Sequence, residues 1–136
     1  MLSVSIIIPT LNEAICLERT LHRLTLLDQP AKEVLVVDGG SEDETVVTAK
    51  RNLELFSAPT EVKVISFNKR GRSIQINYGA SLAIGEILCF LYADTWVPDD
   101  LVSVIESTLA DTTVACGGFI SLNGRLSKNS LGHIFD

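Results

Sequence analysis

The sequence predicts a three-layer α/β fold, in which helices cover both faces of a mostly parallel central sheet. Short β-branched runs, such as residues 4–8 and 34–37, alternate along the chain with longer segments whose apolar residues recur at helical spacing. Strands and helices that alternate in this way form parallel sheets buried on both faces. The 136 residues, of which 46% are hydrophobic, fit a single domain over residues 1–136 with a core of ordinary size.

The first predicted strand covers residues 4–8, a run of mostly β-branched residues that Pro9 ends. Asn12 is expected to cap the helix that follows, with Glu13 in its first turn, because both side chains favour the free amide groups of a helix N-terminus. Pro30 closes this helical region. The apolar side of the helix comprises Ala14, Leu17, Leu21 and Leu24.

The second predicted strand, residues 34–37, leads into the turn Asp38-Gly39-Gly40. Ser41 and Glu44 have the spacing of a capping box and are expected to begin a second helix. Residues 62–67 are predicted as the third strand.

The third helix is predicted over residues 71–83, with Gly85 in the position that a C-cap prefers. The fourth strand covers residues 87–91. Pro98 suits the first turn of a fourth helix, in which Asp99 and Asp100 complement the helix dipole. Residues 114–120 are predicted as a fifth strand, and the apolar pattern beyond them is weak.

Charge and cysteine content narrow the class of protein. The formal net charge of −6 and the pI near 4.8 argue against a nucleic-acid binder, which needs a basic surface for phosphates. Three widely spaced cysteines are typical of a reduced cytosolic chain. No basic segment precedes the first apolar run, and the other apolar stretches are too short to span a bilayer. We therefore expect a soluble cytoplasmic protein, with contact to a membrane surface left open.

Polar segments follow four of the predicted strands, at residues 10–13, 38–43, 67–72 and 92–95. Parallel sheets bind ligands at this edge. Taken singly, each residue has two explanations of about equal weight. Asn12 is either a helix cap or a ligand-binding residue, and Asp38 is either a turn residue or a ligand-binding residue. Taken together, two acidic strand ends and one basic strand end predict a nucleoside diphosphate site, because carboxylates can meet the base, the ribose or a divalent cation and guanidinium groups can meet the phosphates.

These segments resemble the family 2 glycosyltransferases, which have the Rossmann-like GT-A fold. Residues 5–13, SIIIPTLNE, resemble the opening motif of that family, and residues 36–41, VVDGGS, resemble the second motif. The run from Gly71 to Glu86 resembles the third helix and the turn after it. Residues 90–95, FLYADT, resemble the segment that bears the DxD metal motif. The match runs in order from Ser3 to about Phe119 and looks most like a bacterial subgroup of small members.

The resemblance implies a nucleotide-sugar donor, with a UDP-sugar favoured, and a role for each matching residue. Asp38 would contact the base, and Asp94 would hold Mg²⁺ or Mn²⁺ on the diphosphate, where the ion stabilises the departing nucleoside diphosphate. The implied nucleotide-binding residues are Thr10, Asn12, Glu13, Asp38, Gly39, Arg72, Asn77 and Asp94.

The chain departs from the family pattern at two places. The DxD motif reads Tyr92-Ala93-Asp94, so its first carboxylate is absent and the metal would depend more on substrate phosphates. Inverting members place the catalytic base beyond the fifth strand, where Asp136 is the sole acidic residue, so we assign no catalytic residue. The chain is therefore expected to be truncated at its C-terminus relative to the family.

Several functions remain open at this point. The first is a metal-assisted, inverting glycosyltransferase, and the second is a domain that binds the nucleotide sugar without turnover. A nucleotidyltransferase is disfavoured because residues 9–13 hold neither glycine nor a basic residue, and a dehydrogenase because no G-x-G-x-x-G follows the first strand. A homodimer is predicted if missing C-terminal elements leave an open sheet edge near residues 114–120.

Overall fold

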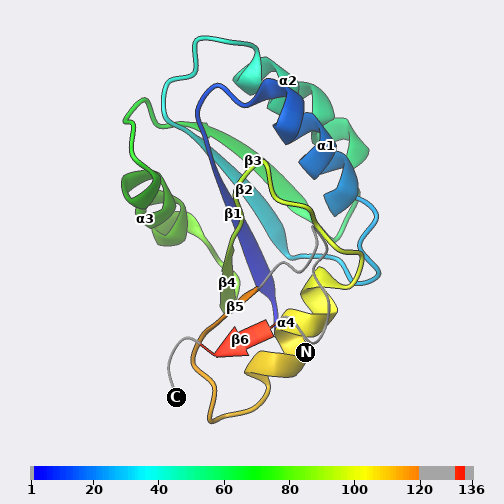
Figure 1. Cartoon of the computed structure of the whole chain (residues 1–136). Helices are drawn as coiled ribbons and strands as arrows, with labels where there is room; N and C mark the ends of the chain where they lie inside the picture. The colour runs from blue at the N-terminus through cyan, green and yellow to red at the C-terminus, as the bar shows by residue number, and fades with distance from the viewer. Residues whose placement is uncertain (1, 120–130, 134–136) are drawn as a thin grey trace.

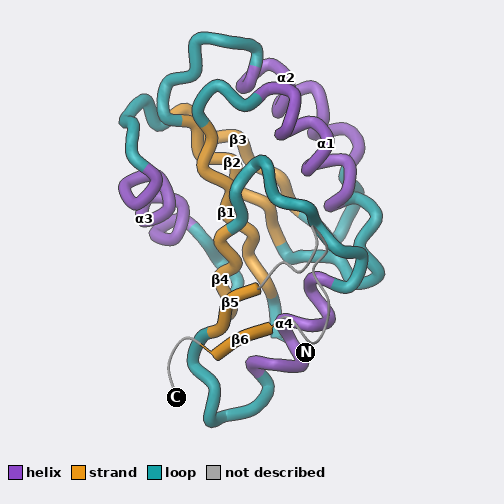
Figure 2. Tube along the Cα trace, in the orientation of Figure 1, coloured by secondary structure: helices purple, strands orange, loops and turns teal. Residues whose placement is uncertain are grey.

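The computed structural model describes residues 2–119 and 131–133, and it has the predicted α/β architecture (Figure 1). Four parallel strands form the central sheet in the order β3-β2-β1-β4. Helices α1 and α2 lie on one side of this sheet and α3 lies on the other (Figure 2). The sheet strands are β1 (Val4–Thr10), β2 (Glu33–Asp38), β3 (Glu61–Ser66) and β4 (Ile87–Phe90). The remaining elements are α1 (Ala14–Leu24), α2 (Thr45–Arg51), the 3-10 helix η1 (Asn52–Leu55), α3 (Arg72–Leu82), α4 (Leu101–Leu109), β5 (Gly117–Phe119) and β6 (Leu131–His133).

The core is divided by the two central strands, whose residues are all buried. Successive side chains of a strand point to opposite faces. Ile6 and Ile8 therefore face the side of α1 and α4, where Leu17 and Leu101 belong to the same cluster. Ile7 faces α3 together with buried residues of β2. This burial on both faces explains why the two strands read as continuous apolar runs in the sequence.

Helix α3 lies unusually close to the sheet because Gly79 has no side chain. A Cβ atom at this position would lie 2.6 Å from Cγ2 of Ile7 and 3.1 Å from Cγ2 of Val37. The close approach brings the N-terminus of α3, with Arg72 as its first residue, beside the carboxyl ends of β1 and β2.

A buried polar cluster holds the opposite edge of the sheet. The hydroxyl of Ser5 donates to Oε1 of Glu33 at 2.7 Å, and the backbone N–H of Ile84 donates to the same oxygen at 2.6 Å. The N–H of Gly85 donates to Ser5 Oγ at 2.8 Å. The prediction that Gly85 is a C-cap was wrong, because α3 ends at Leu82 and the glycine is required where a Cβ atom would overlap Ser5.

The predictions for the last elements also need correction. The strand predicted over residues 114–120 corresponds to β5, which covers Gly117–Phe119 and pairs antiparallel with β6 in a separate two-stranded sheet. It therefore does not extend the central sheet, and residue 120 lies outside the described residues. Within the described ranges, the two edge strands of the central sheet are β3 and β4. Helix α4 begins at Leu101, because Pro98 and Asp99 belong to a preceding turn whose Asp99 carbonyl accepts from the N–H of Asp28 at 2.9 Å.

Candidate functional site

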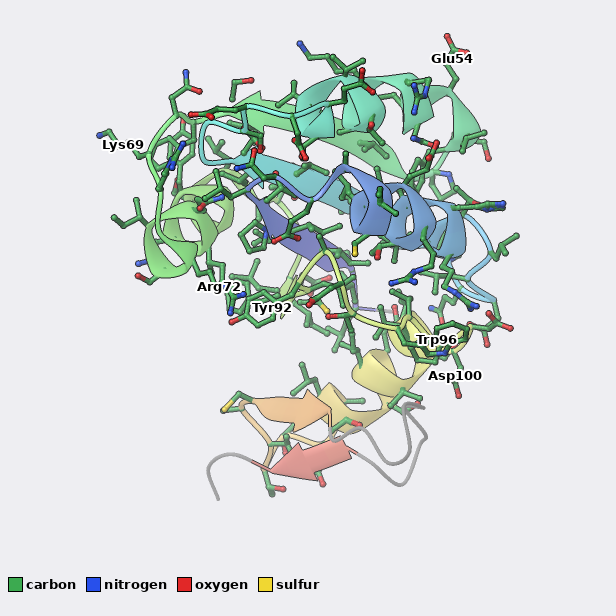
Figure 3. The ribbon with its side chains drawn as sticks, turned by 45° about the horizontal axis from the view of Figure 1, so that its top comes forward. Glu54, Lys69, Arg72, Tyr92, Trp96 and Asp100 are labelled. Carbon is green, nitrogen blue, oxygen red and sulfur yellow. The ribbon has the colours of Figure 1, made fainter. Side chains whose placement is uncertain are left out.

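Polar residues after β1, β2 and β4 gather at one edge of the sheet, since parallel strands end on the same edge. Residues 10–13, 38–45 and 92–95 come from these three strand ends, and α3 adds Arg72 from the other face of the sheet. Figure 3 shows the side chains of Arg72 and Tyr92 lying together at this edge. The structure therefore brings these predicted segments together at one edge of the sheet, and their role in ligand binding stays a prediction.

Asp38 is the organising residue of the β2 end. It is 1% exposed and accepts four hydrogen bonds. Its Oδ1 accepts from the hydroxyls of Thr10 and Ser41 at 2.8 and 2.6 Å. Its Oδ2 accepts from the backbone N–H groups of Gly40 and Ser41 at 3.0 and 2.8 Å. Both carboxylate oxygens are thus engaged by the chain itself, which fixes the course of the backbone after β2.

Asn12 joins the loop after β1 to the loop after β2. Its Oδ1 accepts from the N–H groups of Glu42 and Asp43 at 2.8 and 3.3 Å. Its own N–H donates to Ser41 Oγ at 2.9 Å. The prediction that Asn12 caps α1 was wrong, because its backbone is left-handed, with φ of 53°, and its side chain reaches across to the other loop.

Thr45 makes a second connection between these loops. Its hydroxyl accepts from the N–H of Glu13 at 2.8 Å and donates to Asp43, which holds the pKa of that carboxyl below its ordinary value. The predicted capping box was wrong, because α2 begins at Thr45 and the hydroxyl of Ser41 is committed to Asp38. We call residues 11–13 and 39–44 the paired loops.

Gln75 is a buried residue beside the site whose contacts the sequence analysis did not predict. This side chain of α3 is 3% exposed, and its Nε2 donates to the carbonyl oxygens of Thr10 and Val37 at 2.9 and 2.8 Å. Its Oε1 accepts from the N–H of Gly71 at 3.2 Å. Gln75 therefore ties the ends of β1 and β2 to the start of α3. The signal in the sequence was a glutamine one helical turn before Gly79, on the side of the helix that faces the sheet.

Glu13, Asp94 and Arg72 share one electrostatic environment. Partial burial raises the pKa of Glu13 above its ordinary value, the negative charges of Asp94 and Asp43 raise it further, and the Arg72 guanidinium opposes them. Two carboxylates and one guanidinium therefore act on the Glu13 carboxyl group. Such a mixture suits a ligand that carries both hydrogen-bond donors and negatively charged oxygens.

The segment after β4 is fastened to α1. The N–H of Leu91 donates to the carbonyl of Ile7 at 2.9 Å, and the hydroxyl of Thr20 donates to the carbonyl of Ala93 at 2.5 Å. Further along, the guanidinium of Arg23 stacks on the ring of Trp96, 3.3 Å from its centroid. These contacts fix the backbone on either side of Asp94, whose side chain is exposed.

Two of the predicted nucleotide-binding residues, Gly39 and Asn77, lie in different surroundings. Gly39 packs against Gln75, and a Cβ atom on it would lie 2.9 Å from Gln75 Oε1. Asn77 is exposed on α3, and five residues of helix place it about 140° around the axis from Arg72. The structure therefore does not align Asn77 with Arg72, whereas Thr10, Asn12, Glu13, Asp38 and Gly39 belong to one connected set of loops.

The acidic side chains at this edge, Glu13, Asp43 and Asp94 among them, come from three separate segments of the chain. Over residues 2–119 and 131–133, the structure forms no group of three or more His, Cys, Asp or Glu side chains arranged to hold a metal ion. Asp94 offers one exposed carboxylate. A magnesium or manganese ion there would need further oxygen ligands from a bound phosphate or from water.

Comparison with known protein families and sequences finds glycosyltransferases. The family model described as glycosyl transferase family 2 matches residues 5–134. An uncharacterized glycosyltransferase of Nostoc sp. is 31% identical over 108 residues, which is 77% of this chain and 32% of that protein. Glycosyltransferase AglE of Haloferax volcanii is 35% identical over 119 residues, which is 82% of this chain and 36% of that protein.

Solved structures of glycosyltransferases are also similar to this chain. The mannosyltransferase PcManGT of Pyrobaculum calidifontis, in complex with GDP-Man and Mn²⁺, has a TM-score of 0.72 and 32% identity, covering 83% of this chain and 34% of that one. Residues 1–349 of S. aureus TarS, at 23% identity and a TM-score of 0.71, share the fold. The chain spans about a third of the length of these relatives. None of the described helices has the length and apolar character needed to cross a membrane.

Proposed function

Because the chain belongs to glycosyl transferase family 2, we propose that its strand-end site binds the nucleoside diphosphate of a sugar donor for transfer to an acceptor. The observation that carries this proposal is that Arg72 and Asp94 both act on Glu13, which belongs to the hydrogen-bonded paired loops. The guanidinium can meet phosphate oxygens, and the carboxylates can meet hydroxyl groups or a metal ion.

The paired loops would form the wall of this site. Since the carboxylate of Asp38 is already bonded on both oxygens, we propose that it acts on the nucleotide by shaping Gly39 and Thr10 around it. Asn12 would act in the same way, by holding the second loop in register. Asn77 would lie at the margin of the nucleotide. The general base of an inverting transfer has no assigned residue in the described part of the chain.

We further propose that Asp94 is the protein ligand of a Mg²⁺ or Mn²⁺ ion. Its carboxylate is exposed, so it can share a bound ion with the oxygen atoms of the diphosphate. Bound there, the ion would supply positive charge against the departing nucleoside diphosphate. The Pyrobaculum mannosyltransferase with Mn²⁺ and GDP-Man supports a divalent metal and a nucleotide sugar, and the preference for uridine is our proposal.

Asp94→Ala is expected to abolish nucleotide-dependent stabilisation. UDP with Mn²⁺ at one hundred times its Kd should stabilise the parent chain by about 2.7 kcal/mol, because a ligand that binds only the folded state shifts the unfolding equilibrium. Thermal unfolding with UDP, GDP and no nucleotide measures this effect. Asp99→Ala is the matched control and should keep the stabilisation by nucleotide. Its hydrogen bond with the N–H of Asp28 is made by the backbone carbonyl, which the substitution leaves in place. Absence of any shift in the parent chain with either nucleotide would refute the proposed function.

Binding without turnover is the alternative for this site, because the family places its base in a later segment of the chain. Release of sugar from a UDP-sugar by the purified protein, at a rate that Asp94→Ala lowers, would favour a transferase. Tight binding of the intact UDP-sugar without release of its sugar would favour the hypothesis of a domain that binds the donor without turnover.

We also propose a homodimer formed through β4. On this edge, Leu88 and Phe90 are 41% and 51% exposed, whereas the opposite edge strand β3 exposes the charged residues Glu61 and Lys63. Charged side chains protect an edge strand from pairing, and apolar ones invite it. Light scattering at micromolar concentration should report twice the chain mass for the parent and for Lys63→Glu, and a monomer for Phe90→Lys. A stable monomer of the parent chain would contradict the proposal.

A further inference from the structure

Tyr92 stands where the family resemblance places the first carboxylate of the metal motif, and it contacts a cation instead. The guanidinium of Arg72 lies over the Tyr92 ring, 4.6 Å from the ring centroid (Figure 3). Guanidinium groups at this distance from a ring face are attracted by its electrons. The pair therefore joins α3 to the segment after β4 directly beside Asp94.

The residues before and after Tyr92 are both buried and hydrogen-bonded to neighbouring elements. Leu91 and Ala93 are 5% and 0% exposed, and each is hydrogen-bonded, Leu91 to Ile7 and Ala93 to Thr20. The carbonyl of Tyr92 itself accepts from the N–H of Thr95 at 3.0 Å. The side chain of Tyr92, which is 43% exposed, thus projects from a rigid support.

The backbone of Arg72 is fixed as well, while its long side chain needs a further contact to be placed. Gln75 bonds the N–H of Gly71, which sets the first turn of α3. The two ion pairs found among the described residues belong to Arg51 and Arg70, so Arg72 is not drawn into one of them. Its contact with the Tyr92 ring limits where the guanidinium can lie.

We infer that Tyr92 is a positioning residue, which holds the Arg72 guanidinium where the diphosphate of the donor binds. This inference rests on the proposed function. A planar guanidinium can contact two phosphate oxygens at once, and pre-ordering it on a ring lowers the entropy lost on binding. The side chain that replaces a metal-binding carboxylate thereby strengthens phosphate recognition by a second route.

The test compares phosphate-bearing and phosphate-free ligands at a constant Mn²⁺ concentration. Tyr92→Leu should weaken UDP binding about fivefold, the effect of an exposed cation–ring contact, and leave uridine binding unchanged. Tyr92→Phe keeps the ring and should bind UDP within about twofold of the parent chain. Arg72→Lys keeps the charge without the flat guanidinium and should reproduce the loss seen with Tyr92→Leu.

A double-mutant cycle completes the experiment. In an Arg72→Ala background, Tyr92→Leu should have no further effect on UDP binding, because the ring then has no guanidinium to hold. The inference is overturned if Tyr92→Leu binds UDP like the parent chain, if uridine binding falls equally, or if the loss persists without Arg72. A parent chain that binds no nucleoside diphosphate would overturn the proposed function together with this inference.

Discussion

Asp38→Ala is expected to destabilise the fold by about 3 kcal/mol and to abolish nucleotide binding. The substitution removes four hydrogen bonds to a buried carboxylate and leaves the Thr10 hydroxyl and two backbone N–H groups without an acceptor. Removal of a charged acceptor from a buried hydrogen-bond network lowers the free energy of unfolding by this amount, because the donors left without a partner remain buried away from water. Urea unfolding monitored by circular dichroism gives the free energy of unfolding.

A matched control lies four residues along the same loop. Glu42 is exposed, and its carboxylate forms an exposed ion pair with Arg70 at 3.5 Å. Glu42→Ala should change the free energy of unfolding by less than about 0.5 kcal/mol and leave the nucleotide Kd nearly unchanged. An Asp38→Ala protein as stable as Glu42→Ala would show that the paired loops keep their course without the buried carboxylate.

Gly79→Ala is expected to be the most damaging one-methyl change in α3, destabilising the fold by about 2–3 kcal/mol. The new Cβ would meet methyl groups of Ile7 and Val37 at distances that force the helix outward. The higher helix propensity of alanine offsets only about 1 kcal/mol. Because Arg72 begins the same helix, UDP binding should weaken at the same time.

The control is Ser81→Ala, at an exposed position of the same helix whose hydroxyl donates to the carbonyl of Tyr78. It should alter the free energy of unfolding by less than about 0.5 kcal/mol. Equal stabilities of the two variants, measured by urea unfolding, would mean that α3 has room to shift without loss of packing.

The sheet could be predicted from the sequence because its strands are buried on both faces. Runs such as Ile6-Ile7-Ile8 admit few other structures once helical segments separate them. The parallel arrangement then implies that Thr10, Asp38 and Asp94 lie at one edge, and the structure brings them there. This part of the prediction needed no knowledge of individual contacts.

The capping predictions failed for a physical reason. Asn12 and Ser41 are good helix caps in isolation, but each has a partner from a loop distant in sequence that no local pattern encodes. Gly85 likewise follows a helix, yet its requirement comes from Ser5, eighty residues away along the chain. Local propensity is overridden wherever a tertiary hydrogen bond is available.

The strand after α4 was misplaced for a related reason. Residues 117–119 form a strand, as the apolar pattern indicates, but pairing partners are decided by the whole chain. Periodicity reports which residues are extended and does not report which sheet they join. Gln75 shows the same limit, since its spacing from Gly79 indicates the side of the helix that it occupies but does not identify its acceptors on β1 and β2.

The paired loops have a consequence for protein engineering. The two loops are joined by hydrogen bonds between Asn12 and Ser41 and between Asn12 and Glu42. A further bond joins Glu13 to Thr45, the first residue of α2. Grafting one loop from a relative would leave these partners mismatched, whereas grafting both keeps the interface between them intact. Under the proposed function, an exchange of donor specificity at this edge should therefore transfer both segments together and keep Asp38, whose carboxylate bonds to both ends.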